Sequence, residues 1–166
     1  MIAVRPEKPF DMQAIQQVHL LSFSTPAESK LVDALRVAGH LSLSLVVVVD
    51  GEVVGHVAFS PVSTTLGMPG FGLAPVAVLP EHRQHGLAAL LIHSGLLECK
   101  TLGFGWGVVL GNPLYYSRFG FRPASDFGLT STFGGDASFQ ALELIPGQLP
   151  LGAGLVKYAP EFVVFE

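Results

Sequence analysis

The segment Arg83-Gln84-His85-Gly86-Leu87-Ala88 joins an apolar run to a helical one and contains a basic side chain among small residues. Gly86 and Ala88 carry little or no side chain, so an anion can approach the backbone closely there. The first N–H groups of a helix have no partner within the helix and lie at the positive end of its dipole. The junction therefore predicts an anion cradle, which suits a diphosphate better than an apolar ligand.

The elements that would position this cradle read as strand, helix and strand. Residues 71–79 form an apolar run typical of a buried strand, and residues 106–110 form another. Pro75 interrupts the first run and cannot donate a ladder hydrogen bond, so we expect a bulge or a local opening there. A helix with apolar residues at helical spacing is expected from Gly86 to about Leu102, ended by Gly103.

Upstream, two β-rich runs at residues 43–49 and 53–59 flank Asp50-Gly51. Asp-Gly tolerates the positive φ angles of a tight hairpin turn, so this pattern predicts a β-hairpin. We expect the second strand to end at Pro61. A short first strand over residues 2–4 and two helices, over about 11–21 and 26–37, complete this half.

The last third of the chain has weaker periodicity and more Gly, Pro and Phe. Short strands are expected at residues 121–123, 141–144 and 162–165, with a loop at 149–155. Hairpins followed by a strand–helix–strand crossover predict an α/β or α+β sandwich. The length of 166 residues suits one domain spanning residues 1–166.

Composition excludes some classes of function. Charged residues make up 13% of the chain and the net charge is −4, whereas a general nucleic-acid binder needs a basic face. A mildly acidic protein suits a cationic amine substrate. The low charge content is compatible with a homodimer interface or a ligand groove.

Cellular location follows from two further features. The single cysteine, Cys99, allows no disulfide within the chain and is expected to be a small buried hydrophobe. The first residues lack the apolar core of a signal peptide, and the run Leu45–Val49 is too short to span a bilayer. We therefore expect a cytoplasmic protein that does not enter a membrane.

The segment VAVLPEHRQHGLA, residues 76–88, resembles the acetyl-coenzyme A signature of the GNAT superfamily of N-acetyltransferases. Arg83, Gly86 and Ala88 fill its pattern [Gln/Arg]-x-x-Gly-x-[Gly/Ala]. The segment GNPLYYSRFGF, residues 111–121, is similar to a second signature, a tyrosine shortly before Gly-Phe, in a form typical of one bacterial branch of predicted acetyltransferases. Two motifs in this order are more specific than either one alone.

The resemblance implies a mixed, mostly antiparallel sheet that splays between its fourth and fifth strands, with Pro75 at or near the opening. Acetyl-coenzyme A, the cosubstrate, would lie in the cleft. Its pantetheine arm would pair with the backbone of Val76 and Val78, and a backbone N–H near Ala77–Val78 would polarise the acetyl carbonyl. Its pyrophosphate would meet the amides of Gln84, His85, Gly86, Leu87, Ala88 and Ala89.

The implied reaction is direct transfer of the acetyl group from the thioester to a primary amine. Tyr116 matches the family tyrosine that protonates the leaving thiolate, although simple packing with Tyr115 and Phe119 is the alternative. Asn112 would bond the pantetheine arm or cap a helix that starts at Pro113. No general base is assigned, because His56 is more typical of a structural histidine and Glu81 of a solvated turn residue.

Several alternatives stay open at this level. His82, His85 and His93 are interpreted as exposed residues near a helix start, so no metal site is predicted. A non-catalytic module that binds acyl-coenzyme A is the alternative to an enzyme. The acceptor, a small molecule or a peptide amine, depends on the loops at residues 23–30, 63–70 and 127–137, which carry no recognition motif.

Overall fold

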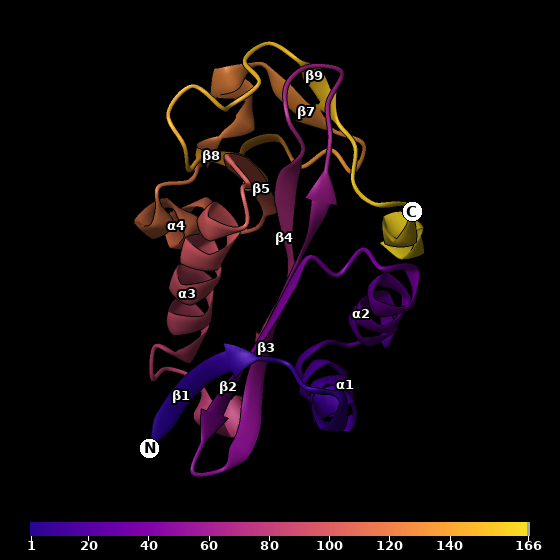
Figure 1. Cartoon of the computed structure of the whole chain (residues 1–166), viewed down its shortest axis with the longest axis vertical. Coiled ribbons are helices and arrows are strands. Elements are labelled where there is room, and N and C mark those ends of the chain that lie inside the picture. The colour runs from indigo at the N-terminus through magenta and orange to yellow at the C-terminus, as the bar shows by residue number, and fades with distance from the viewer. Residues whose placement is uncertain (166) are drawn as a thin grey trace.

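A computed structural model describes residues 1–165, and within them a seven-stranded sheet has the order β1-β2-β3-β4-β5-β8-β6 (Figure 1). The strands are β1 (Ile2–Pro6), β2 (Leu43–Val49), β3 (Glu52–Val62), β4 (Gly70–Val78), β5 (Trp106–Leu110), β6 (Arg122–Pro123) and β8 (Phe139–Glu143). Adjacent strands are antiparallel except β4 and β5, which are parallel. The mixed, mostly antiparallel sheet predicted from the sequence is confirmed.

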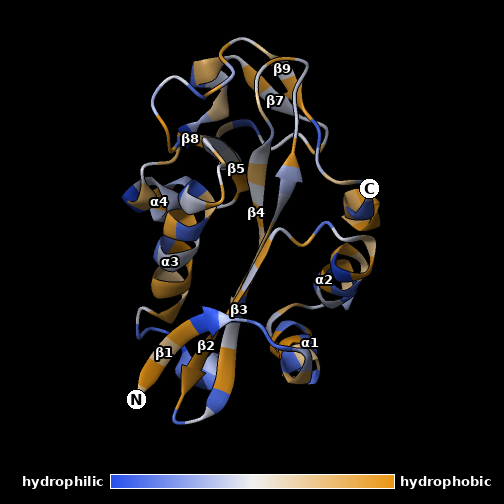
Figure 2. Ribbon diagram, in the orientation of Figure 1, coloured by the Kyte–Doolittle hydropathy of each residue, from blue (hydrophilic) through white to orange (hydrophobic). Residues whose placement is uncertain are grey.

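Helices cover both faces of this sheet. Figure 1 shows α3 (Leu87–Thr101) and α4 (Pro113–Tyr116) on one side, and α1 (Met12–Ser22) and α2 (Ala27–Ala38) on the other. Orange and pale segments predominate on the strands, whereas α1, α2 and α3 mix orange and blue (Figure 2). No helix within residues 1–165 combines the length and apolar character needed to cross a membrane.

The predicted hairpin is present between β2 and β3. Asp50 and Gly51 both take positive φ, 50° and 83°, as the tight turn requires. The second strand runs further than expected, because Pro61 pairs with Phe71 and β3 continues to Val62. The proline removes one ladder donor without ending the pairing.

The important irregularity lies at Pro75. Val57 of β3 pairs with Val76, but Phe59 pairs with Leu73, so two β4 residues stand opposite Ala58. This is a β-bulge, which bends the strand that carries the extra residue. On its other side β4 pairs with β5 only from Phe71 to Leu73. The two strands therefore part where Pro75 interrupts the ladder, as predicted.

The C-terminal third matches its prediction in part: the strands expected at residues 121–123 and 141–144 correspond to β6 and β8. Residues 162–165 lie in the 3₁₀ segment η6 (Pro160–Phe165) and not in a strand. Phe162 packs with Leu31 and Leu35 of α2, and this contact takes the chain away from the sheet edge. Part of the expected loop at 149–155 belongs to β9 (Gly154–Val156), which pairs in parallel with β7 (Leu129–Ser131) as a second small sheet.

Helix α3 approaches the sheet closely at Gly95. A Cβ atom at this position would lie 2.3 Å from Phe59, which is fully buried and stacks edge-on against Phe71 at 5.4 Å. Because the Phe59 ring is enclosed, it has little room to move aside. The glycine thus sets the distance between α3 and the strands that carry the site.

Gly95→Ala should therefore destabilise the protein although alanine favours helices. The propensity gain is about 1 kcal/mol, while overpacking an enclosed core costs about 1–3 kcal/mol. We expect a net loss of about 1 kcal/mol in the free energy of unfolding, measured with urea. Leu97→Ala, on the exposed side of the same helix, is the control and should change stability by less than about 0.5 kcal/mol. A stabilised Gly95→Ala variant would contradict this packing.

Candidate acetyl-coenzyme A site

The predicted cradle is formed by the turn before α3. Gln84 and Gly86 take positive φ, 67° and 75°, and Gly86 is the residue that precedes the helix. The first backbone bond into the helix runs from the Leu90 amide to the Gly86 carbonyl at 3.0 Å. Within residues 1–165, the amides from Gln84 to Ala89 have no bonded acceptor. Six N–H groups are thus available to an anion.

A cavity of about 430 Å³ lies over these amides. It is lined by Val78, His82, Arg83, Gln84, Gly86, Leu87, Ala88, Ala89, Tyr115 and Arg118. Two cations, Arg83 and Arg118, line this cavity. Such a pair adds charge to the amides that a diphosphate would meet.

Sequence reasoning missed Arg118 and Tyr115. The Arg118 guanidinium lies over the Tyr115 ring at 4.3 Å, and its Nε donates to the Tyr115 carbonyl at 2.9 Å. These contacts hold the cation over the cavity. The signal was present in the segment Tyr-Tyr-x-Arg-Phe-Gly-Phe, where only the second tyrosine was given a role.

The free edge of β4 lies next to the cradle. The Leu79 amide donates to the Val54 carbonyl at 2.8 Å, so Leu79 belongs to a hydrogen-bonded pair with β3. In an antiparallel ladder the direction alternates from residue to residue, which turns Ala77 toward β3 and Val76 and Val78 toward the opening. These two residues therefore present backbone groups to a ligand that lies along β4.

The structure restricts which backbone groups of β4 a ligand can use. Arg83 Nε donates to the Val78 carbonyl at 2.8 Å, so that carbonyl already has a donor. The Val78 N–H, and not that of Ala77, points into the opening, because alternation directs Ala77 to β3. Val78 is accordingly the better candidate to polarise a carbonyl.

Tyr116 is buried and is not among the residues that line the cradle cavity. Its ring packs with Tyr115 at 5.1 Å and Phe121 at 5.9 Å, and a Cβ at Gly111 would lie 2.4 Å from it. Burial raises the pKa of Tyr116 to about 12, with a smaller contribution from Tyr115. The phenol is thus protonated at neutral pH.

Asn112 acts as the N-cap of α4. Its Oδ1 accepts a hydrogen bond from the Leu114 amide at 3.0 Å, which was the structural alternative stated from the sequence. The cap fixes the start of α4 directly after β5 and so places Tyr115 and Tyr116. Contact of Asn112 with a pantetheine arm stays a prediction.

His56 lies in a buried chain of polar groups on the α1 side of the sheet. Its Nδ1 is 2.8 Å from Nε2 of His19, and its Nε2 is 2.8 Å from Oγ of Ser44. The Ser44 hydroxyl donates to Glu7, which Arg36 pairs at 2.8 Å. Both imidazole nitrogens of His56 are engaged, so the structural interpretation of this histidine is confirmed.

The hydrogen bonds also fix the tautomers. Because the Ser44 hydroxyl donates to Glu7, its oxygen accepts from Nε2–H of His56, whose Nδ1 then accepts from Nε2–H of His19. Within residues 1–165, Nδ1 of His19 is left as a buried lone pair without a donor. Burial lowers the pKa of His19 to about 4. Burial, followed by the charges of His19 and Arg36, lowers the pKa of His56 well below its usual value.

The comparisons with known proteins agree with this geometry. The sequence profile of the acetyltransferase (GNAT) domain matches residues 3–124. The uncharacterised N-acetyltransferase YhbS of Escherichia coli K12 is 40% identical over 162 residues, covering 96% of this chain and 97% of that protein. This chain therefore belongs to the GNAT family of acetyltransferases.

Solved structures extend the comparison. The crystal structure of E. coli YhbS in complex with coenzyme A has a TM-score of 0.94 at 39% identity, covering 99% of this chain and 93% of that one. A GNAT acetyltransferase from Brucella melitensis in complex with acetyl-coenzyme A has a TM-score of 0.80 at 37% identity, covering 98% of both chains. The fold thus corresponds along nearly its whole length to relatives that hold the coenzyme.

The buried histidines should make the protein sensitive to acid. The pKa of His19 is about 4 in the folded protein and near 6.5 when unfolded, so the unfolded chain binds more protons between these values. Stability is full above pH 6.5 and falls as the pH drops toward 4, by about 3 kcal/mol for His19 alone. Urea unfolding at a series of pH values measures this loss.

Substitution isolates the contribution. His19→Gln removes the titrating imidazole. The slope of the unfolding free energy against pH should then fall by about one proton between pH 4 and 6.5. His85→Ala, at the exposed turn before α3, is the control and should leave the slope of the parent protein. An unchanged slope in His19→Gln would show that this imidazole is not buried in its neutral form.

Proposed function

We propose that this protein transfers an acetyl group directly from acetyl-coenzyme A to a primary amine. One observation carries the proposal: the free amides of the cradle and the unpaired edge of β4 meet at Val78, which lines the same cavity. A diphosphate at the cradle would place an attached arm along Val76 and Val78. The two relatives that hold coenzyme A or acetyl-coenzyme A support the same ligand.

The reaction needs little covalent participation by the protein. The amine nitrogen attacks the thioester carbonyl, a C–N bond forms, and the C–S bond breaks. The amine loses one proton and the thiolate gains one, giving an amide and free coenzyme A. The Val78 N–H would polarise the carbonyl, and Tyr116 would donate the proton to the thiolate.

The pKa of Tyr116 suits this role once burial is considered for both partners. A phenol with a pKa of about 12 is a poor donor to a thiolate in water, whose pKa is about 8.5. Loss of hydration around the bound coenzyme would raise the pKa of its thiol as well. We therefore propose that the released thiolate is basic enough to take the Tyr116 proton.

Two measurements separate this enzyme from a non-catalytic module that binds acyl-coenzyme A. Calorimetric titration with acetyl-coenzyme A tests binding, and release of free thiol over a panel of amines tests transfer. We expect both. Binding without thiol release on any amine would favour the non-catalytic module, and absence of binding would exclude both functions.

Tyr116→Phe should lower kcat about a hundredfold because the leaving thiolate loses its proton donor. The dissociation constant for acetyl-coenzyme A should stay unchanged, since the ring and its packing are kept. Tyr115→Phe is the matched control: this tyrosine lines the cradle and should keep most of kcat. An unchanged kcat in Tyr116→Phe would remove Tyr116 from the mechanism.

Arg118→Ala should raise the dissociation constant for acetyl-coenzyme A about tenfold, because a charge-assisted bond to phosphate is lost. The loss should shrink as salt is added. Arg122→Ala removes an exposed arginine of the same region, which pairs with Asp126 and does not line the cavity. Equal effects of the two substitutions in calorimetry would show that Arg118 acts only through net charge.

A further inference from the structure

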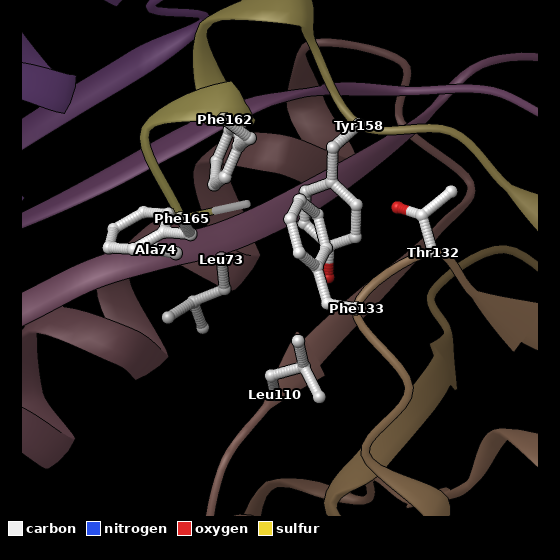
Figure 3. Close-up of a pocket in the computed structure, with 8 residues that line it drawn as sticks. All are labelled: Leu73, Ala74, Leu110, Thr132, Phe133, Tyr158, Phe162 and Phe165. Carbon is white, nitrogen blue, oxygen red and sulfur yellow. The ribbon is translucent and has the colours of Figure 1, made fainter.

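A second cavity, of about 600 Å³, opens where β4 leaves β5. Its lining residues are Leu73, Ala74, Leu110, Thr132, Phe133, Tyr158, Phe162 and Phe165, as Figure 3 shows. They come from the end of the paired part of β4, the end of β5, the loop after β7 and the C-terminal segment. The cavity shares no lining residue with the cradle.

The cavity and the cradle both reach the unpaired part of β4. The cavity meets this strand at Leu73 and Ala74, and the cradle meets it at Val78. Between them lie Pro75, Val76 and Ala77, where the ladder to β5 is absent. A thioester held along Val76 and Val78 would therefore be next to the mouth of this cavity.

The walls are aromatic and fixed. Phe133 packs edge-on against Tyr158 at 5.5 Å, Tyr158 lies 4.9 Å from Phe162, and Phe162 lies 6.3 Å from Phe165. The Phe162 ring is buried and packs with Leu31 and Leu35 of α2. The rings thus form one continuous wall anchored on the α2 side of the sheet.

Charge is missing from this lining. Among the residues that the structure describes, those lining the cavity include no Asp, Glu, Lys or Arg, and the polar side chains are Thr132 and Tyr158. Burial raises the pKa of Tyr158 far above its usual value, so it stays a neutral phenol. A charged group placed inside would lose its hydration without an ionic partner.

From this chemistry we propose that the acceptor is a primary amine with an apolar, ring-containing body and no second charge. The body fills the aromatic cavity, and the amino group points to β4, where it meets the thioester. This assignment rests on the proposed function, since it names the substrate of the same site. Polyamines and aminoglycosides are excluded as good acceptors, because each would bury unpaired charges.

The test compares two primary amines, 2-phenylethylamine and 1,5-diaminopentane, in the thiol-release assay with the full chain. We expect kcat/KM to be at least about tenfold higher for the aromatic amine, from burial of its ring. Phe133→Ala should lower that kcat/KM about tenfold, mainly through KM, and leave acetyl-coenzyme A binding unchanged. Equal or better use of the diamine would overturn the assignment.

Two further variants show whether a change in KM comes from the cavity or from a loss of folding. Phe165→Ala changes an exposed ring at the rim of the cavity and should also raise KM, whereas Phe10→Ala removes an exposed ring that does not line it and should not. The thermal midpoint of each variant is measured alongside. An unaltered KM in both Phe133→Ala and Phe165→Ala would refute the assignment.

Failure of the assignment and failure of the proposed function are distinguishable. If thiol is released with polar amines only, the protein is an acetyltransferase and the aromatic acceptor is wrong. If no thiol is released, calorimetry of 2-phenylethylamine with the protein saturated by coenzyme A still probes the cavity. If 2-phenylethylamine binds and Phe133→Ala weakens this binding, the cavity is an aromatic amine site. If it does not bind, the assignment is rejected.

Discussion

The separation of β4 from β5 after three residue pairs is the constraint on which the other features depend. A parallel pair that continued past Leu73 would satisfy the backbone of Val76 and Val78 within the sheet. The bulge opposite Ala58 bends β4 away, and Pro75 lacks the N–H that a longer ladder would use. Backbone groups on a central strand that no neighbouring strand pairs are uncommon, so this opening is the place where we propose that the coenzyme binds.

The elements on either side of this opening have contrasting chemistry. On the α3 side, free amides and the cations Arg83 and Arg118 favour an anion. On the α2 side, four aromatic rings form one wall of a cavity whose described lining carries no charge. The sheet therefore separates a site suited to a phosphorylated coenzyme from one suited to an apolar body. The two meet only at the unpaired segment of β4.

The sequence predicted the elements whose signals are local. The Asp50-Gly51 turn, the small residues before α3 and the proline in β4 each act within a few positions, and each was located correctly. Features that depend on contacts between distant parts of the chain were not predicted. Residues 162–165 were expected in a strand because their apolar, β-branched pattern fits one, yet packing of Phe162 on α2 decides their structure. The aromatic cavity likewise joins segments far apart in the chain.

The buried histidine network and the apolar cavity bear on the same question, the fate of the amine proton. His56 pairs with Ala77 across the sheet, but its two nitrogens are engaged and its neutral form is favoured by burial, so it is unsuited to act as a base. The proposed acceptor site offers another route. If the apolar body fills the aromatic cavity, its amino group at β4 would lie beside an apolar lining that favours the neutral amine, and the proton would pass to water. An uncharged lining that favours the neutral amine would make a protein base unnecessary.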